Sequence, residues 1–309
     1  IDPVTARIIR NRGIEGEAAI DRYLNGTLDD LYDPMLLKDM ERAVSILCEA
    51  VDTGKKIRIV GDYDIDGVCS TYILLQAFER LGSDVDFEIP DRIKDGYGIN
   101  ESIIEQAHAD GVEVILTCDN GISAFHQVEL AKKYGMTVVI TDHHEVPLDG
   151  EKEKIPPADA VIDPKQADCP YPFPEICGAV VAYKLVQVLY ARRGVPQMEW
   201  LDLLEFAAIA TVGDVMKLQD ENRILVKYGL KKMAQTKNLG LRRLAEKNNL
   251  DLGAITAYHI GFVIGPCLNA GGRLKTAKEA LALLRAQSEE EAERLAEELK
   301  ELNDTRKDM

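Results

Sequence analysis

Short apolar runs alternate with helical repeats between residues 55 and 165. Five runs rich in β-branched residues are predicted to be strands, at 57–60, 85–89, 113–117, 137–141 and 160–162. Between the first four strands, apolar residues recur at helical spacing over about 67–81, 100–109 and 123–134. Strands that alternate with helices form a parallel sheet whose two faces are covered by those helices. The expected fold class is therefore α/β, with a parallel sheet and helices on both faces.

The chain on either side of this α/β region is predicted to be helical. Residues 1–50 form an N-terminal helical arm, which the Asp33–Pro34 step should interrupt because proline disfavours a helical residue before it. Residues 51–215 form the α/β domain, and residues 216–276 form a helical subdomain that completes the core. Inside that subdomain, a glycine-rich stretch at 261–272 is expected to be an irregular loop.

The tail of the chain, residues 277–309, is predicted to be one long amphipathic helix. Leucines recur on one stripe of this segment, and glutamates occupy the other face, which we expect to be solvated. A long helix in this position is expected to lead as a linker toward a second domain.

Three aspartates directly follow the first predicted strand. Asp62, Asp64 and Asp66 lie in a turn between a buried strand and a buried helix, at the carboxyl edge where parallel α/β sheets bind ligands. Carboxylates this close together repel one another, and a divalent cation such as magnesium or manganese would neutralise them. A solvated turn in which Asp66 caps the following helix explains the cluster equally well. A calcium loop does not, because its twelfth position must be a bidentate glutamate and is Ile73 here.

Three further segments end in acidic or histidine residues. Asp119 follows the third strand, His143 and His144 come after the fourth, and Asp214 follows a later apolar run that ends like a strand. One aspartate after one strand is usually a helix cap or a turn residue. Four separate segments that end this way, in a chain with only five histidines, favour one shared metal site over four unrelated caps.

The composition limits the class of protein. An apolar content of 46% with 29% charged residues is ordinary for a globular chain, and no apolar run is long enough for a membrane span. The chain begins at Ile1 without a signal peptide, as expected for a fragment or a trimmed chain. The six cysteines form no C-x-x-C pair and no zinc spacing, so free thiols in a reducing cytoplasm are expected. A net charge of −16 excludes a polycation that coats nucleic acid, but it is compatible with a nuclease that has a local basic groove.

Several motifs occur together along nearly the whole chain: GDYDIDG (61–67), DRIKDGYG (91–98), CDNG (118–121), DHH (142–144), DPKQADCPYP (163–172), CGAVVAYKL (177–185), GDV (213–215) and LNAGGR (268–273). In this combination the chain resembles the DHH phosphoesterase family, and within it the RecJ single-strand-specific exonucleases. RecJ proteins also carry a second domain with a Gly-Gly-His motif and then an OB-fold, and neither occurs before Met309. The resemblance therefore indicates a RecJ catalytic core.

The resemblance implies a site that holds two divalent metals, usually manganese, with magnesium also possible. The implied metal ligands are Asp62, Asp64, Asp66, Asp119, His143 and Asp214. Among them, Asp119 would bridge the two ions, and Asp62 would bind directly or orient the other ligands. Mixed aspartate and histidine ligands suit manganese better than magnesium, which prefers oxygen ligands.

The resemblance also implies which residues meet the substrate. His144 would stabilise the charge of the scissile phosphate, with Asp142 orienting the histidine pair. Arg92, Asn269 and Arg273 would contact substrate phosphates, although a surface ion pair is the plain alternative for both arginines. The expected catalytic residues are thus His144, Asp119 and Arg273. The remaining candidates are expected to be ordinary turn, surface or core residues: Asp163, His108, His126 and His259.

The expected function is metal-dependent 5′→3′ hydrolysis of phosphodiester bonds in single-stranded DNA, for DNA repair and recombination. Two ions ~3.5–4 Å apart would activate a water and clamp the leaving oxygen. A passage too narrow for a duplex would select single strands by width. One alternative is a DHH phosphodiesterase that acts on short oligonucleotides, cyclic dinucleotides or pyrophosphate. Another is a non-catalytic, replication-associated binding module, and the complete set of acidic and histidine residues counts against it.

The expected partners follow from the same resemblance. They are single-stranded DNA, a single-strand-binding protein and a repair helicase, with no membrane. The protein is expected to be a cytoplasmic monomer.

Overall fold

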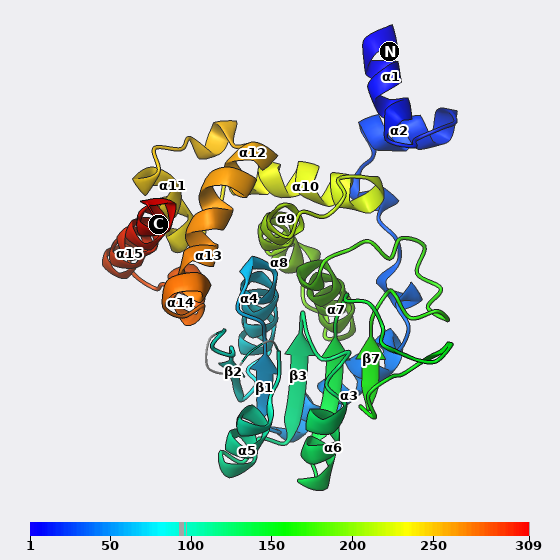
Figure 1. The fold of residues 1–309 in the computed structure, drawn as a ribbon, viewed down its shortest axis with the longest axis vertical. Coiled ribbons are helices and arrows are strands. Elements are labelled where there is room, and N and C mark those ends of the chain that lie inside the picture. The colour runs from blue at the N-terminus through cyan, green and yellow to red at the C-terminus, as the bar shows by residue number, and fades with distance from the viewer. Residues whose placement is uncertain (93–95, 97, 309) are drawn as a thin grey trace.

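The centre of the molecule is a five-stranded parallel sheet (Figure 1). The computed structural model describes residues 1–92, 96 and 98–308. The strands are β1 (Ile57–Val60), β2 (Val85–Glu88), β3 (Val114–Cys118), β4 (Thr137–Thr141) and β7 (Ala160–Ile162), in the spatial order β2-β1-β3-β4-β7. All four neighbouring pairs are parallel. The direction of strand progression reverses beside β1, so the switch point of the sheet lies between the carboxyl ends of β1 and β3.

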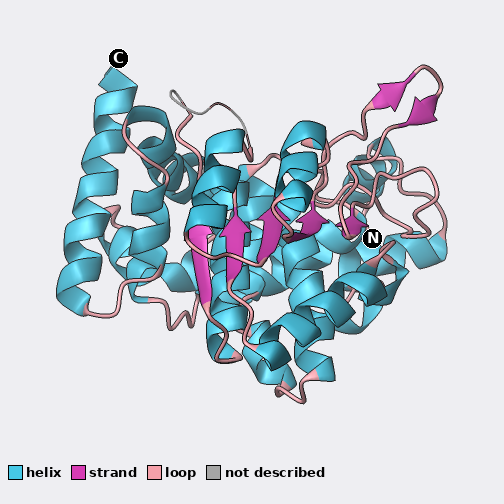
Figure 2. Ribbon diagram, turned by 90° about the horizontal axis from the view of Figure 1, so that it is seen from below, coloured by secondary structure: helices cyan, strands magenta, loops and turns pink. Residues whose placement is uncertain are grey.

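Helices cover both faces of this sheet (Figure 2). Helices α3 (Met40–Thr53), α4 (Ile65–Arg80) and α7 (Gly178–Arg192) share one apolar core with strand residues such as Ile57 and Ile59. Helices α5 (Glu101–Ala109) and α6 (Phe125–Lys133) share the opposite core with Val60 and Ile115. Successive strand side chains point to opposite faces, so β1, β3, β4 and β7 contribute to both cores, whereas β2 contributes only to the first. The predicted fold class is confirmed, and a small hairpin of β5 (Leu148–Asp149) and β6 (Lys152–Glu153) was not predicted.

A second helical layer lies beyond the carboxyl edge of the sheet (Figure 1). It comprises α8 (Gln197–Leu201), α9 (Leu204–Gly213), α10 (Asp220–Met233), α11 (Leu239–Lys247), the 3₁₀ turn η3 (Leu252–Ala254), α12 (Ala257–His259), the π-helical turn η4 (Ile260–Ile264) and α13 (Gly265–Leu274). Within this layer, α9 packs against α4, α7 and α10. This packing fixes the helical layer over the strand ends, where ligands bind in such sheets.

The glycine-rich stretch at 261–272 is helical, so the expected irregular loop is wrong. Its glycines permit close packing rather than turns. A Cβ at Gly272 would lie 2.3 Å from the carbonyl oxygen of Tyr63, and one at Gly271 would lie 2.7 Å from that of Thr276. The absence of a side chain at Gly272 therefore lets α13 approach the turn that follows β1, and at Gly271 it makes room for the backbone of Thr276.

The tail contains two helices rather than one. Helix α14 (Lys278–Leu284) ends before a turn, and α15 (Glu289–Asp308) then begins with the backbone amide of Glu291 donating to Ser288 Oγ at 3.1 Å. The expected long C-terminal helix is present, but it begins twelve residues later than expected. Its leucine stripe is buried against α11, α13 and α14. The domain boundaries and the linker role stay predictions, and Met309 lies outside the described residues.

The N-terminal arm begins with two helices, α1 (Pro3–Asn11) and α2 (Glu17–Asn25), that extend away from the sheet (Figure 1). Two 3₁₀ turns follow, η1 (Leu28–Asp30) and η2 (Pro34–Leu36), and no helix runs through the Asp33–Pro34 step, where Asp33 caps the second turn. The six cysteines are free thiols, four of them buried. Among the described residues, no helix combines the length and the apolar character needed to cross a bilayer.

Candidate metal centre

Acidic and histidine side chains from four segments converge at the switch point of the sheet. Three groups each place their ligand atoms within 4.8 Å of one another: Asp62, Asp64 and Asp119; Asp66, His143 and Asp214; and Asp119, His143 and His144. Asp214 comes from the C-terminal end of α9, so the expectation that it follows a strand-like end is wrong. The structure thus brings together all six residues proposed as metal ligands.

The turn after β1 places its three aspartates in different directions. Asp64 is the N-cap of α4, because its Oδ1 accepts from the amides of Asp66 at 2.9 Å and Gly67 at 3.1 Å. The alternative in which Asp66 caps this helix is therefore wrong. Asp66 is 1% exposed and accepts instead from the amides of Gly178 and Ala179, both at 2.7 Å. Those amides belong to the first turn of α7, where the helix dipole favours an anion.

Asp119 lies at the middle of the cluster on a constrained backbone. Its φ is 61°, in the left-handed region that aspartate tolerates better than most residues, and the side chain is buried. The next residue, Asn120, fixes the turn by donating from Nδ2 to the carbonyls of Val60 at 3.0 Å and Cys118 at 2.9 Å. Gly178, the first residue of α7, packs against this turn: a Cβ at Gly178 would lie 2.7 Å from the Cβ of Asp119. Glycine at 178 therefore makes the space that Asp119 occupies.

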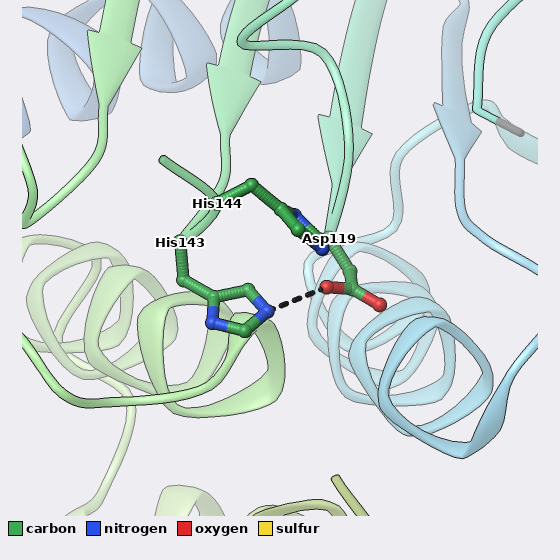
Figure 3. Close-up of side chains that lie close together, drawn as sticks. All are labelled: Asp119, His143 and His144. Carbon is green, nitrogen blue, oxygen red and sulfur yellow. Dashed lines mark ion pairs between the residues drawn. The ribbon is translucent and has the colours of Figure 1, made fainter. Parts of the chain in front are cut away.

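The two histidines after β4 have different partners. His143 Nε2 lies 3.1 Å from Asp119 Oδ1 (Figure 3), 3.4 Å from Asp66 Oδ2 and 3.9 Å from Asp214 Oδ2. Burial lowers the pKa of His143, which favours the neutral imidazole that ligates metals. His144 instead has its Nδ1 2.7 Å from Oδ1 of Asp142.

The environment of this cluster disfavours the charged form of its carboxylates. Burial, and then the charge of Asp64, raises the pKa of Asp62 to about 7. Burial, and then the charge of Asp66, likewise raises the pKa of Asp214 to about 7 and the pKa of Asp119 well above its ordinary value. Buried carboxylates that face one another with a neutral imidazole among them are the donor set of a divalent cation site. The ligand groups overlap at Asp119 and His143, so together they form one continuous cluster that could hold divalent cations.

The three residues expected to contact phosphates lie beside this cluster. Arg92, Asn269 and Arg273 line a cavity of about 270 Å³ together with Asp64 and Asp214. The guanidinium of Arg92 lies 5.4 Å from the ring centre of Tyr63, which lines the same cavity. The cavity therefore joins cationic and amide groups to the acidic cluster. The rest of the DRIKDGYG stretch falls partly outside the described residues, at Ile93, Lys94, Asp95 and Tyr97.

Sequence reasoning missed the residues that shape this site without carrying charge. Gly178 and Asn120 are two of them, and their only signal was their position in the CGAVVAYKL and CDNG motifs. Asp163 is a turn residue, as expected, with Oδ1 accepting from the amide of Lys165 at 2.8 Å. It is also fully buried, and burial followed by the charge of Asp142 raises its pKa to about 7. The acidic edge of the sheet thus extends beyond the predicted ligands.

Comparison with known proteins matches this geometry to one family. Residues 56–211 match the DHH family, N-terminal domain. The single-stranded-DNA-specific exonuclease RecJ of Bacillus subtilis is 38% identical over this whole chain, which covers 38% of that protein. The RecJ of Escherichia coli is 36% identical, and the chain covers 54% of it. A crystal structure of exonuclease RecJ bound to manganese superposes with a TM-score of 0.79 at 35% identity, covering 88% of this chain and 67% of the other.

The chain thus spans about half or less of the length of these curated relatives. The chain belongs to the DHH family, and it is similar to RecJ exonucleases along its whole length.

Proposed function

We propose that this chain is the catalytic core of a metal-dependent exonuclease that hydrolyses single-stranded DNA from its 5′ end. The observation that carries the proposal is the convergence of His143 with Asp66, Asp119 and Asp214 at the sheet edge, beside a cavity lined by two arginines. A binding module would have no need for buried carboxylates that repel one another. A phosphodiesterase requires them to hold cations against a phosphate.

The donor set fits divalent cations. Asp62, Asp64 and Asp119 would hold one ion, and Asp66, His143 and Asp214 would hold another, with Asp119 also within reach of His143. Manganese is the better fit because a histidine shares the site with carboxylates, and similar RecJ structures are described as bound to manganese or to magnesium. When bound, such ions activate water and polarise the phosphate.

The side chains of this chain would bind and orient the strand. Asp142 raises the pKa of His144 by accepting its hydrogen bond, although burial alone would lower that pKa. This direction favours the imidazolium, from which His144 would donate a hydrogen bond to the scissile phosphate. Arg273 and Arg92 would form charge-assisted hydrogen bonds with neighbouring phosphates, and Asn269 would donate from its amide.

The remaining properties of the protein belong to the same proposal. Selection of single strands would come from the width of the approach between the helical layer and the sheet edge. The proposed setting is DNA repair and recombination in the cytoplasm, where a monomer would act with a single-strand-binding protein and a helicase.

The test is manganese-dependent release of 5′ mononucleotides from single strands labelled at either end. We expect Asp119→Ala to lower the rate by about 1,000-fold or more, because it removes the shared ligand. Asp149→Ala, an exposed aspartate in β5, is the matched control and should leave the rate unchanged. A wild-type chain that leaves such strands intact, together with a longer form that also fails, would refute the proposal.

A further inference from the structure

Two aromatic side chains form an exposed stack on the helical layer. Tyr258 is 64% exposed and Phe262 is 67% exposed, although both are large and apolar. Their ring centroids lie 4.7 Å apart with an interplanar angle of 27°. Rings this exposed contribute little to the packing of the core. Their surface is therefore open to a ligand.

The stack lies on an unusual piece of backbone next to the proposed phosphate contacts. Tyr258 is in α12, and Phe262 is in η4, a π-helical turn of the kind that is frequent at functional sites. Gly261, the neighbour of Phe262, lines a hollow of about 160 Å³ with Gly213, Asn269, Arg273 and Arg306. The aromatic stack is therefore next along the chain to a residue that lines this hollow with two arginines and an amide, and Arg273 and Asn269 also line the cavity beside the acidic cluster.

We propose that Tyr258 and Phe262 form a stacking platform for the bases of a single strand whose phosphates lie along Asn269, Arg273 and Arg306. This inference rests on the proposed function, since it extends the same substrate away from the metal centre. Aromatic faces beside cationic side chains are the two components of sequence-independent single-strand binding. A duplex has its base faces covered by neighbouring pairs, so the platform would also favour single strands.

The chemistry around the stack favours a nucleic acid over a protein partner. An apolar helix or domain would bury the rings, but it would also remove water from the nearby guanidinium groups without supplying anions. Burying unpaired charges in this way is unfavourable in free energy. A phosphate backbone supplies those anions at the spacing of the bases. The test must therefore distinguish binding of a nucleic-acid strand to the stack from packing of a protein segment on it.

The experiment compares two fluorescent strands, a thymidine 12-mer and the same strand with abasic sites, bound to the Asp119→Ala protein, in which we expect cleavage to be about 1,000-fold or more slower. The test variant adds Tyr258→Ala and Phe262→Ala. The control adds Met198→Ala, an exposed apolar residue of α8. We expect the parent and the control to bind the base-bearing strand about 10-fold or more tightly than the abasic strand, and the test variant to lose that preference.

Retention of the preference by the test variant would overturn the platform, as would an equal loss of affinity for both strands. In the cleaving protein, the two substitutions should raise KM while leaving kcat within about twofold, because the rings lie outside the reacting groups. If the parent protein binds neither strand and the wild type cleaves nothing, the proposed function has failed along with the platform. If the wild type cleaves and the preference is absent in the parent, only the platform has failed. Equal melting temperatures for the test variant and the control would exclude unfolding as the cause.

Discussion

His144 and Asp142 are joined by a hydrogen bond of 2.7 Å between Nδ1 and Oδ1. Asp142 is itself fixed, because its Oδ2 accepts from the amide of Ile122 at 2.8 Å and its Oδ1 from the amide of His143 at 2.8 Å. Burial alone would raise the pKa of Asp142, but the hydrogen bond from His144 and these amides hold it below its ordinary value. The carboxylate therefore stays charged and favours an imidazolium at His144.

Asp142→Asn should shift the pH dependence of strand cleavage. The substitution removes the negative charge that raises the pKa of His144, so this pKa falls and the imidazolium is lost at a lower pH. The alkaline limb of kcat/KM should therefore move to lower pH. A pH–rate profile measures this, and His144→Gln, which has no titrating ring, should lack the same limb. An unshifted limb in Asp142→Asn would show that His144 does not act in its protonated form.

The metal-free protein should lose stability as pH rises from about 4 to about 7. The folded-state pKa of Asp62 and of Asp214 is about 7, above the ordinary value of 3.8, because of burial followed by neighbouring carboxylates. In this window the folded state binds more protons than the unfolded state, so the free energy of unfolding falls with rising pH. Asp163 and Glu205, whose pKa burial also raises to about 7, act in the same direction.

Melting temperatures in a chelator, measured between pH 5 and pH 8, test this dependence. Asp62→Asn is the control, because it removes one of the titrating groups and should flatten the curve. Manganese should raise the melting temperature more at pH 8 than at pH 5.5, since binding must displace protons from these carboxylates at the lower pH. A metal-free melting temperature that climbs through this window, in parallel for both proteins, would contradict the assignment.

The sheet was predictable because four of its five strands, all except the half-buried β2, are largely buried. The β-branched runs of β1, β3 and β4 are bounded by turn residues, and this pattern is typical of buried parallel strands. The approximate position of the acidic site follows from the sheet, since the carboxyl ends of parallel strands share an edge. The identity of the ligands came instead from the family resemblance.

The errors lie where tertiary contacts, rather than local preferences, decide the structure. Gly265, Gly271 and Gly272 read as loop residues in sequence, but they lie in α13, where their neighbours approach too closely for a side chain. The sequence also does not show which aspartate caps α4 and which one contacts α7, because Asp64 and Asp66 are identical residues two positions apart. Asp66 meets the amide of Gly178 across 112 residues, and no local pattern records that contact.

Gly178→Ala should weaken metal binding more than it weakens the fold. Its new Cβ would lie 2.8 Å from Asp119 Oδ1, so the carboxylate must move. We expect manganese affinity to fall by about 10-fold or more, with a loss of about 1–3 kcal/mol in the free energy of unfolding. Gly229→Ala is the matched control, since its Cβ would clash with that of Ala208 between α9 and α10, away from the cluster.

Isothermal titration with manganese and urea unfolding of both glycine variants provide the measurement. The control should lose similar stability but keep wild-type affinity for the ion. Equal affinities for the two variants would mean that the space around Asp119 does not control metal binding.

Lys184 and Glu221 form a buried ion pair that should hold the N-terminal arm to the helical layer. Their side chains are 1% and 0% exposed, and Lys184 Nζ lies 3.0 Å from Glu221 Oε2. The same ammonium donates to the carbonyl of Tyr32 in the arm at 3.1 Å. Lys184→Met should therefore lower the free energy of unfolding by about 3–5 kcal/mol, because it leaves a buried carboxylate without its cation.

The double variant Lys184→Met, Glu221→Leu separates the loss of one partner from the value of the pair. Replacing both charges removes the uncompensated carboxylate, so urea unfolding should show a smaller loss than in the single variant. Arg294→Ala, which breaks an exposed pair with Glu298, should cost less than about 1 kcal/mol. A double variant that is less stable than Lys184→Met would contradict this expectation, and would show that Glu221 stabilises the fold through its other contacts, such as the hydrogen bond from the Tyr171 hydroxyl.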